Sequence, residues 1–119
     1  MSGAEIKKQL TSLCEASKEI KSSMVVSSDG FVIAHHGDAR DPDLFGALFL
    51  ELKVVCEKII TQLDYEEVEE VYIRSKSGGV TVFPIFDKGY LACLSSVNLN
   101  AGTVQILAWK YVRKIYELL

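Results

Sequence analysis

The feature that most constrains this chain is its hydrophobic spacing, which changes twice from the period of a helix to that of a strand and back again. Apolar residues recur every three to four positions in residues 3–20, 41–64 and 98–119, which is typical of amphipathic helices. Between these segments, short runs rich in Val, Ile and aromatic residues alternate with Gly, Asp and Pro, which is typical of strands joined by turns. The pattern predicts the order αββαβββα.

Five strands are expected, at residues 23–28, 31–36, 68–75, 79–86 and 89–97. Asp29-Gly30 favours a two-residue type I′ turn between the first two strands, and Gly78-Gly79 supplies a later turn. Pro84 has no N–H to donate to a neighbouring strand, so it marks a bulge or an unpaired edge. We therefore predict an α/β (α+β) domain with a five-stranded antiparallel sheet flanked by helices.

Local signals mark where each helix begins. Ser2 and Glu5 have the spacing of a capping box. Asp41-Pro42 places an N-cap residue before a proline at the first helical position. Asn98 or Asn100 can cap the last helix.

Composition limits the class of protein. The chain has 119 residues, of which 49% are hydrophobic, and no linker divides it, so we expect a single domain spanning residues 1–119. No apolar run approaches the roughly 20 residues of a membrane span, and the charged N-terminal stretch is unlike a signal peptide. A net charge of −3 gives no basic footprint for nucleic acid. We expect a cytoplasmic protein.

The sequence contains no recognisable catalytic or metal-binding motif. Cys14, Cys56 and Cys93 form no C-x-x-C pair and occupy apolar positions, so we interpret them as small core residues. His35-His36 lies on a strand, where neighbouring side chains point to opposite faces and cannot share one ion. Ser77-Gly78-Gly79 lacks the spacing of a phosphate-binding loop. We expect neither enzyme activity nor a cofactor.

The element order alone does not choose among profilin, longin, PAS and related folds. Three segments, however, resemble the Roadblock/dynein light chain family, which includes the bacterial MglB-type regulators: residues 27–34 (SSDGFVIA), 78–85 (GGVTVFPI) and 90–94 (YLACL). The resemblance covers essentially the whole chain. It implies a Roadblock/profilin-like fold.

The same resemblance implies a platform-like dimer, in which two sheets join edge to edge and the central helices pair across one face. Members of the family scaffold or regulate small Ras-like GTPases, or act as adaptors on dynein intermediate chains. Some bacterial members carry long extensions, which this chain lacks.

The helix at residues 41–64 supports a partner independently of the resemblance. At 100° per residue, one wide stripe is expected to face the sheet: Phe45, Leu48, Phe49, Leu52, Cys56, Ile59, Ile60 and Leu63. A second stripe on the opposite side holds Ala47, Leu50 and Val54, with Leu44 and Val55 at its flank. We interpret the second stripe as a dimer seam centred on Leu50, with Gly46 and Ala47 allowing two helices to approach closely. Scattered exposed apolar residues on a monomer are the alternative.

Two further surfaces are candidates for partners. Val71 and Ile73, on the strand at residues 68–75, are placed by the resemblance at the sheet edge that meets its twin, although a solvated edge carrying Glu69, Glu70 and Arg74 accounts for the sequence equally well. On the last helix, the candidate second partner surface comprises Ile106, Trp109, Arg113 and Tyr116. The alternative is that Trp109 folds back over the sheet or against the first helix.

The leading hypothesis is a dimeric protein-interaction module, non-catalytic on its own, that scaffolds or regulates a small Ras-like GTPase. Its expected partners are a second copy or a related Roadblock subunit, together with the GTPase. One alternative is a structural adaptor that binds a peptide or another Roadblock-like subunit. Another is a small-molecule sensor of profilin or PAS type, which would need a large apolar pocket.

Overall fold

The computed structural model describes residues 3–38, 40–97 and 101–119. It confirms the order αββαβββα. The elements are α1 (Gly3–Ala16), β1 (Ile20–Ser27), β2 (Val32–Gly37), α2 (Pro42–Gln62), β3 (Val71–Arg74), β4 (Gly79–Pro84), β5 (Gly89–Ser95) and α3 (Ala101–Leu118). The expected caps Ser2, Asn98 and Asn100 lie outside the described residues.

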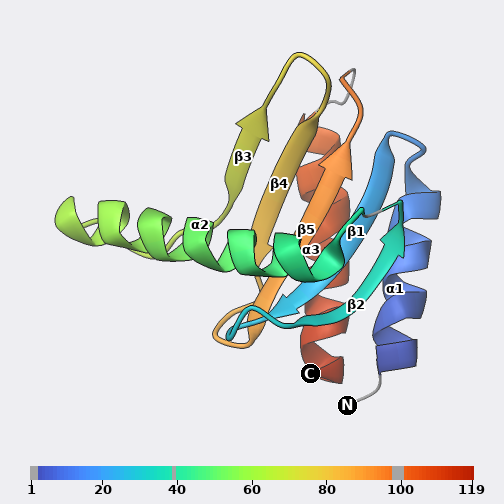
Figure 1. Cartoon of the computed structure of the whole chain (residues 1–119), viewed down its shortest axis with the longest axis horizontal. Helices are drawn as coiled ribbons and strands as arrows, with labels where there is room; N and C mark the ends of the chain where they lie inside the picture. The colour runs from blue at the N-terminus through green and yellow to red at the C-terminus, as the bar shows by residue number, and fades with distance from the viewer. Residues whose placement is uncertain (1–2, 39, 98–100) are drawn as a thin grey trace.

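The five strands form one antiparallel sheet in the order β2-β1-β5-β4-β3 (Figure 1). The pairing of β1 with β5 joins the two strand blocks that the sequence places on either side of α2. As a result β2 and β3 lie at the two edges of the sheet. The predicted fold class is confirmed.

The two faces of the sheet are covered unequally. α1 and α3 pack side by side on one face (Figure 1) and bury most of the core. This cluster comprises Ile6, Leu10, Leu13, Ile20, Val25, Ala34, Phe83, Ile85, Leu91, Cys93, Val104, Ala108, Tyr111, Val112 and Ile115. The other face carries α2 alone, over a smaller cluster of Met24, Val26, Phe49, Val82, Tyr90 and Ala92. The α2 side is therefore the thinner layer.

Several predicted boundaries were wrong, and two of them have a clear cause. Ile20 was expected in the first helix, but it begins β1, where it pairs with Ser95 and its N–H donates to the Ser17 carbonyl. β3 is shorter than predicted, because its ladder with β4 begins at the pair Val71–Val82. Two residues further along β4 stands Pro84, which has no N–H to extend that ladder. Pro84, which pairs with Tyr90 of β5, thus ends the ladder of β4 with β3, in agreement with the second of the two predicted alternatives, a bulge or an unpaired edge.

The hairpin between β1 and β2 does not use the expected two-residue type I′ turn. That turn needs positive φ at both central residues, but Gly30 has φ 87° while Asp29 is not in the positive region. Instead, Ser27 and Phe31 close a three-residue loop: the Ser27 N–H donates to the Phe31 carbonyl at 2.8 Å and the Gly30 N–H to the Ser27 carbonyl at 3.0 Å. This turn lies directly under α2.

Candidate protein-interaction surface

The start of α2 is fixed by its cap and by one close contact. The Asp41 carboxylate accepts the Leu44 N–H at 3.2 Å, and Pro42 follows at the first helical position, as predicted. Gly46 is buried against the hairpin turn. The turn lies so close that a β-carbon at residue 46 would be only 2.7 Å from the Gly30 carbonyl oxygen. Gly46 therefore serves contact with the chain's own hairpin, and not the helix–helix approach expected from the sequence.

Only the first half of α2 is supported by its own sheet. Within the helix, Gly46 and Phe49 are buried, whereas the C-terminal half extends past β3 (Figure 1). A helix of 21 residues is about 32 Å long, which exceeds the width of the strands beneath it. Ile59 at 54% and Leu63 at 53%, both predicted to face the sheet, are consequently exposed, and Leu48, also predicted to face it, is exposed at 43% at the margin of the packed face. Their assignment to the core was wrong.

The residues of the predicted seam all lie on α2, with unequal exposure. Leu44, Val54 and Val55 are exposed at 51%, 42% and 52%, and Ala47 is exposed too. Leu50, the expected centre, is half-buried, because its side chain packs against Gly30 in the hairpin turn. The seam therefore runs along the outside of the helix, with Leu50 at its inner margin.

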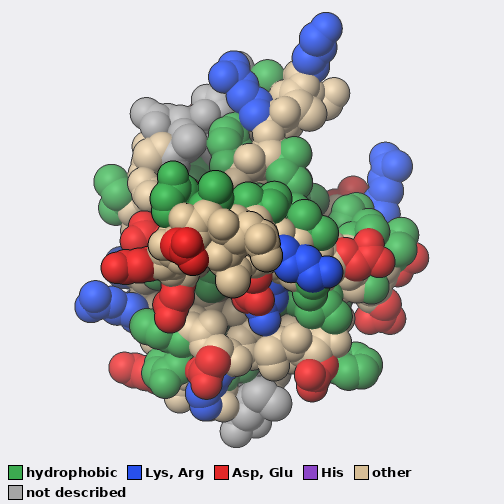
Figure 2. Space-filling view, turned by 90° about the vertical axis from the view of Figure 1, so that its left-hand side faces the viewer, with side chains coloured by type: hydrophobic (Ala, Val, Ile, Leu, Met, Phe, Trp, Pro, Cys, Tyr) green, Lys and Arg blue, Asp and Glu red, His purple; other side chains and the backbone are tan. Residues whose placement is uncertain are grey.

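The misassigned residues extend this apolar surface. Leu44, Leu48, Val55, Ile59 and Leu63 share one side of α2 and form what we call the outer stripe. The outer stripe and the predicted seam overlap at Leu44 and Val55. The view onto the protruding end of α2 shows hydrophobic side chains gathered in a band, flanked by acidic side chains (Figure 2).

The edge strand β3 adds to the same side of the molecule. Val71 is half-buried and packs against the cluster under α2. Ile73 lies on the same face of the sheet and is 46% exposed. The Glu70 carboxylate, on the opposite face, accepts a hydrogen bond from the Gln105 side chain of α3. Both candidate residues of β3 thus lie on the α2 side.

The four residues of the candidate surface on α3 are exposed to different degrees. Trp109 is half-buried and packs edge-on against Phe83, with ring centroids 6.0 Å apart, so it folds back over the sheet. Tyr116 packs against the exposed Phe86 at 4.7 Å. Ile106, 75% exposed, and Arg113 point outward. The four residues share one side of α3 at helical spacing, but they differ in how far they are exposed.

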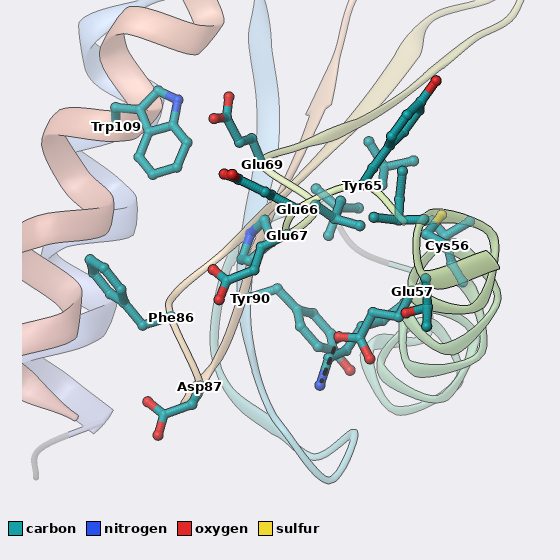
Figure 3. A pocket seen from close by; sticks show the side chains of 18 residues that line it. Cys56, Glu57, Tyr65, Glu66, Glu67, Glu69, Phe86, Asp87, Tyr90 and Trp109 are labelled. Atoms are coloured by element: carbon teal, nitrogen blue, oxygen red, sulfur yellow. Dashed lines mark ion pairs between the residues drawn. The ribbon is translucent and has the colours of Figure 1, made fainter. Parts of the chain in front are cut away.

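A groove that the sequence analysis missed lies beneath the second half of α2. It has a volume of about 1210 Å³ and is bounded by α2, the segment 65–69, the ends of β3 and β4, and Trp109. The side chains of Glu57, Glu66, Glu67, Glu69 and Asp87 surround it (Figure 3). The sequence offers only one signal for this groove, a run of four glutamates at residues 66–70.

Three groups have displaced pKa values, each chiefly because of burial. Burial raises the pKa of the Cys93 thiol in the core and that of Cys14, whose Sγ lies 3.3 Å from Ser23 Oγ. Burial, with a smaller contribution from the charge of Glu57, raises the pKa of Tyr90. The two thiols are therefore protonated at neutral pH, as expected of core residues.

Neither a metal centre nor a membrane span is evident in the part of the chain that the structure describes. No group of three or more His, Cys, Asp or Glu side chains there is arranged to hold a metal ion. Likewise, none of the helices there is both long and apolar enough to cross a membrane. His36 instead lies with Nδ1 3.1 Å from Thr11 Oγ1.

The fold and its exposed apolar helix define an α+β domain of the Roadblock/profilin type. A family model of the Roadblock/LC7 domain matches residues 6–95, and the chain belongs to this family. The resemblance inferred from the sequence is confirmed.

Solved structures with the same fold have little sequence in common with this chain. MglB of Myxococcus xanthus superposes with a TM-score of 0.91 at 12% identity, covering 98% of this chain and 89% of that one. A Roadblock/LC7 domain from Streptomyces avermitilis gives 0.88 at 20% identity, covering 94% and 95%. Profilin II of Acanthamoeba castellanii gives 0.65 at 16% identity, covering 94% and 97%. No curated protein matches the sequence.

Proposed function

We propose that this protein is a dimeric interaction module that scaffolds or regulates a small Ras-like GTPase without catalysing a reaction itself. The observation that carries the proposal is the exposed apolar side of α2, in a chain that belongs to the Roadblock/LC7 family. The family is generally one of adaptors and regulators, and the resemblance to MglB-type proteins supports the GTPase as partner.

Hydrophobic burial is the driving force for the dimer. Leu44, Val54 and Val55 each expose about half of their surface. Complete burial of such a side chain is worth about 1.5–3 kcal/mol, so covering the exposed half gives roughly 1 kcal/mol per residue. In a symmetric pair each contribution counts twice. The α2 seam, extended by Leu48 and Ile59 of the outer stripe, is therefore the first contact of the proposed dimer.

The open edge of β3 is the second contact, and its charges select a register. The Ser75 N–H donates to the Gly78 carbonyl, so alternation directs the N–H and C=O groups of Tyr72 and its neighbours Glu70 and Arg74 away from β4. Antiparallel pairing with a second copy, centred on Tyr72, places each Arg74 opposite Glu70 of that copy. Shifting the centre to residue 71 or 73 loses both charge pairs.

Sedimentation equilibrium tests the dimer. We expect the wild type to dimerise and Val55→Asp to be a folded monomer with the circular-dichroism spectrum of the wild type, because Val55 is 52% exposed. Ile106→Asp is the matched control: Ile106 is 75% exposed on α3 and should leave the dimer intact. Leu50→Asp is a poorer test, since Leu50 also packs on the hairpin turn.

A charge exchange tests the register. Arg74→Glu should weaken the dimer about tenfold, because two attractive pairs become repulsive, and Glu70→Arg in the same chain should restore it. A wild type that stays monomeric at high micromolar concentration would refute the dimer. An Arg74→Glu defect that Glu70→Arg does not repair would refute only the register.

The proposed action on the GTPase is a population shift: the platform binds one arrangement of the switch regions better than the others. The small Ras-like GTPases of the source organism, loaded with GTPγS or GDP, provide the test. We expect one of them to bind in a nucleotide-dependent manner and its hydrolysis or exchange rate to change. Equal failure of every GTPase to bind would argue against the role, while mixed dimers in native mass spectrometry would favour an adaptor paired with a related subunit.

A further inference from the structure

We propose that one side of α3 binds an extended, proline-rich and acidic segment of a partner protein. We call this surface the aromatic row, and it consists of Trp109, Arg113 and Tyr116 on α3 with Phe86 and Lys88 in the turn between β4 and β5. The inference goes beyond the proposed dimer and its GTPase, because α3 lies on the opposite face of the sheet from α2 (Figure 1).

The proposed dimer leaves the aromatic row uncovered. Edge-to-edge pairing at β3 adds a second sheet in the plane of the first, so the β4 strands of the two copies are three strand spacings, about 14 Å, apart. Helices that pack on each other are about 8–10 Å apart. Each α3 packs over its own β4 through Trp109 and Phe83, so the α3 of one copy does not cover the aromatic row of the other.

Neither the turn nor burial explains why residue 86 is a phenylalanine. Phe86 has φ 51°, a left-handed conformation that favours Gly or Asn over a bulky side chain. The turn imposes this conformation, because the Ile85 N–H donates to the Gly89 carbonyl at 2.8 Å and the Lys88 N–H donates to the Ile85 carbonyl at 3.0 Å. The ring is nevertheless 67% exposed. A large ring held at a strained and exposed position indicates a surface that contacts another molecule.

The rings of the aromatic row have nearly the spacing of a polyproline II helix. Trp109 and Tyr116 are seven residues apart on α3, which corresponds to about 10.5 Å along the helix. One turn of a polyproline II helix contains three residues and advances about 9.3 Å. Each ring is also backed by a phenylalanine: Trp109 packs against Phe83, and Phe86 points toward α3 and packs against Tyr116 (Figure 3). Two prolines three residues apart can therefore each stack on one ring.

The charge of α3 selects an acidic segment. α3 carries three cations, Lys110, Arg113 and Lys114. With Glu117 as its single anion it has a net charge of +2, whereas the whole chain has a net charge of −3. This helix is therefore a basic surface on an acidic protein, and a segment that carries carboxylates complements it.

Two cations flank Tyr116 directly. Lys88 Nζ lies 5.6 Å from the centroid of the Tyr116 ring, and Arg113 precedes Tyr116 by three residues on the same side of α3. Neither cation forms an ion pair with any residue that the structure describes. Both can bind a carboxylate that follows the proline on Tyr116. The Arg113 guanidinium can also donate to backbone carbonyls, which a polyproline II helix leaves without internal partners.

The fluorescence of Trp109 tests the proposal, because Trp109 is the only tryptophan of the chain and belongs to the aromatic row. The probe is a peptide of ten prolines followed by three glutamates, which has no fluorescence of its own in this range. The negative probes are ten prolines followed by three lysines, and a ten-residue Gly-Ser segment followed by three glutamates. We expect a saturable change in emission with the first peptide and a Kd about fivefold higher, or higher still, with each negative probe. No saturable change with the first peptide, or equal affinity for either negative probe, would overturn the proposal.

Phe86→Asn separates binding from folding. Asn adopts positive φ more readily than Phe, so the relief of strain offsets the lost ring contact and the melting temperature should stay within about 2 °C. The variant removes the ring behind Tyr116 and should weaken binding of the acidic proline peptide about fivefold. Phe31→Ala is the matched control, because Phe31 is 73% exposed in the turn between β1 and β2, and its Kd should stay within about twofold of the wild type. Equal losses in the two variants, or unchanged affinity in Phe86→Asn, would contradict the proposal.

Arg113→Gln tests the charge, with Lys110→Gln as its control on the same helix. Lys110 Nζ lies over the Tyr111 ring, away from Tyr116, so only Arg113→Gln should reduce the preference for glutamate over lysine in the peptide, by about threefold. An equal reduction in both variants would refute the acidic segment. If Phe86→Asn instead dissociates a dimer in sedimentation equilibrium while peptide binding persists, the aromatic row belongs to a second copy and the proline-rich segment is excluded. The titrations apply equally to a monomer and a dimer, so their failure would leave the proposed dimer untouched.

Discussion

The contact between Gly46 and Gly30 gives the sharpest test of how α2 is held on the sheet. Substituting Ala for Gly inside a helix normally stabilises it by about 1 kcal/mol. At residue 46 the added β-carbon would meet the Gly30 carbonyl oxygen at 2.7 Å and Val32 Cγ2 at 3.1 Å. The closer neighbour is backbone and cannot rotate away, so the helix or the hairpin must move.

Overpacking of this kind costs about 1–3 kcal/mol. After the gain in helix propensity is subtracted, Gly46→Ala should lower the free energy of unfolding by about 1–2 kcal/mol. For a domain of 119 residues, this corresponds to a fall in melting temperature of about 4 °C per kcal/mol. The sign is the informative part, because propensity alone predicts a rise.

Urea denaturation followed by circular dichroism measures the change, and Ala47→Gly is the matched control. Ala47 is exposed on the same turn of α2, so its substitution should cost only the propensity term of about 1 kcal/mol. If Gly46→Ala stabilises the protein by about as much as Ala47→Gly destabilises it, α2 does not approach the hairpin as closely as the structure shows.

Three further predictions concern stability. Because burial raises the pKa of the Cys93 thiol, the unfolded chain releases this proton above about pH 9 while the folded chain keeps it. This thiol should then lower the free energy of unfolding by up to about 1.4 kcal/mol per pH unit, and in urea titrations between pH 9 and 10 Cys93→Ala should make the fall in stability shallower by that contribution. Asp41→Ala removes the acceptor of the Leu44 N–H and should cost about 1 kcal/mol in the same assay, whereas no loss would show that the cap is replaced by water. Trp109→Ala should cost about 3 kcal/mol, because its ring packs on Phe83; a marginal loss would instead favour a role in binding a partner.

Much of the fold follows from local sequence signals. Asp41-Pro42 and the glycine-containing turns act on their own neighbours, and for that reason the element order could be predicted. Ile20 shows the limit of such signals, since it continues the helical spacing of α1 and yet pairs with Ser95 of β5. A strand pairing between distant segments outweighed the local period.

The wrong assignment of several α2 residues to the core has a different cause. Periodicity identifies which residues share a side of a helix, but it does not reveal how far the sheet beneath them extends. Ile59 and Leu63 have the expected period and remain exposed, because the edge strand β3 is short and α2 continues past it, whereas Leu48, next to the buried Phe49, lies at the margin of the face that packs on the sheet. The sequence thus predicted correctly that these residues share one apolar side of the helix, but it predicted wrongly that this side packs on the sheet.

The groove depends on residues that lie far apart in the sequence. Glu57, Glu69 and Asp87 come from α2, the segment before β3 and the turn after β4, and only the tertiary structure brings them around one space. No pattern confined to one element could have predicted this groove.

The uneven support of α2 separates two kinds of perturbation along a single helix. Before and at Phe49 the helix is held by its cap, by the Gly46–Gly30 contact and by the cluster on the sheet, so substitutions there change folding stability. Beyond Leu52 the same helix exposes Val54, Val55 and Ile59, so substitutions there leave little to lose within the monomer. We therefore expect folding stability to depend mainly on the buried residues in the first half of α2, and association to depend on the exposed residues along its whole length. A substitution such as Val55→Asp that changed both equally would show that the second half of α2 depends on the partner to fold.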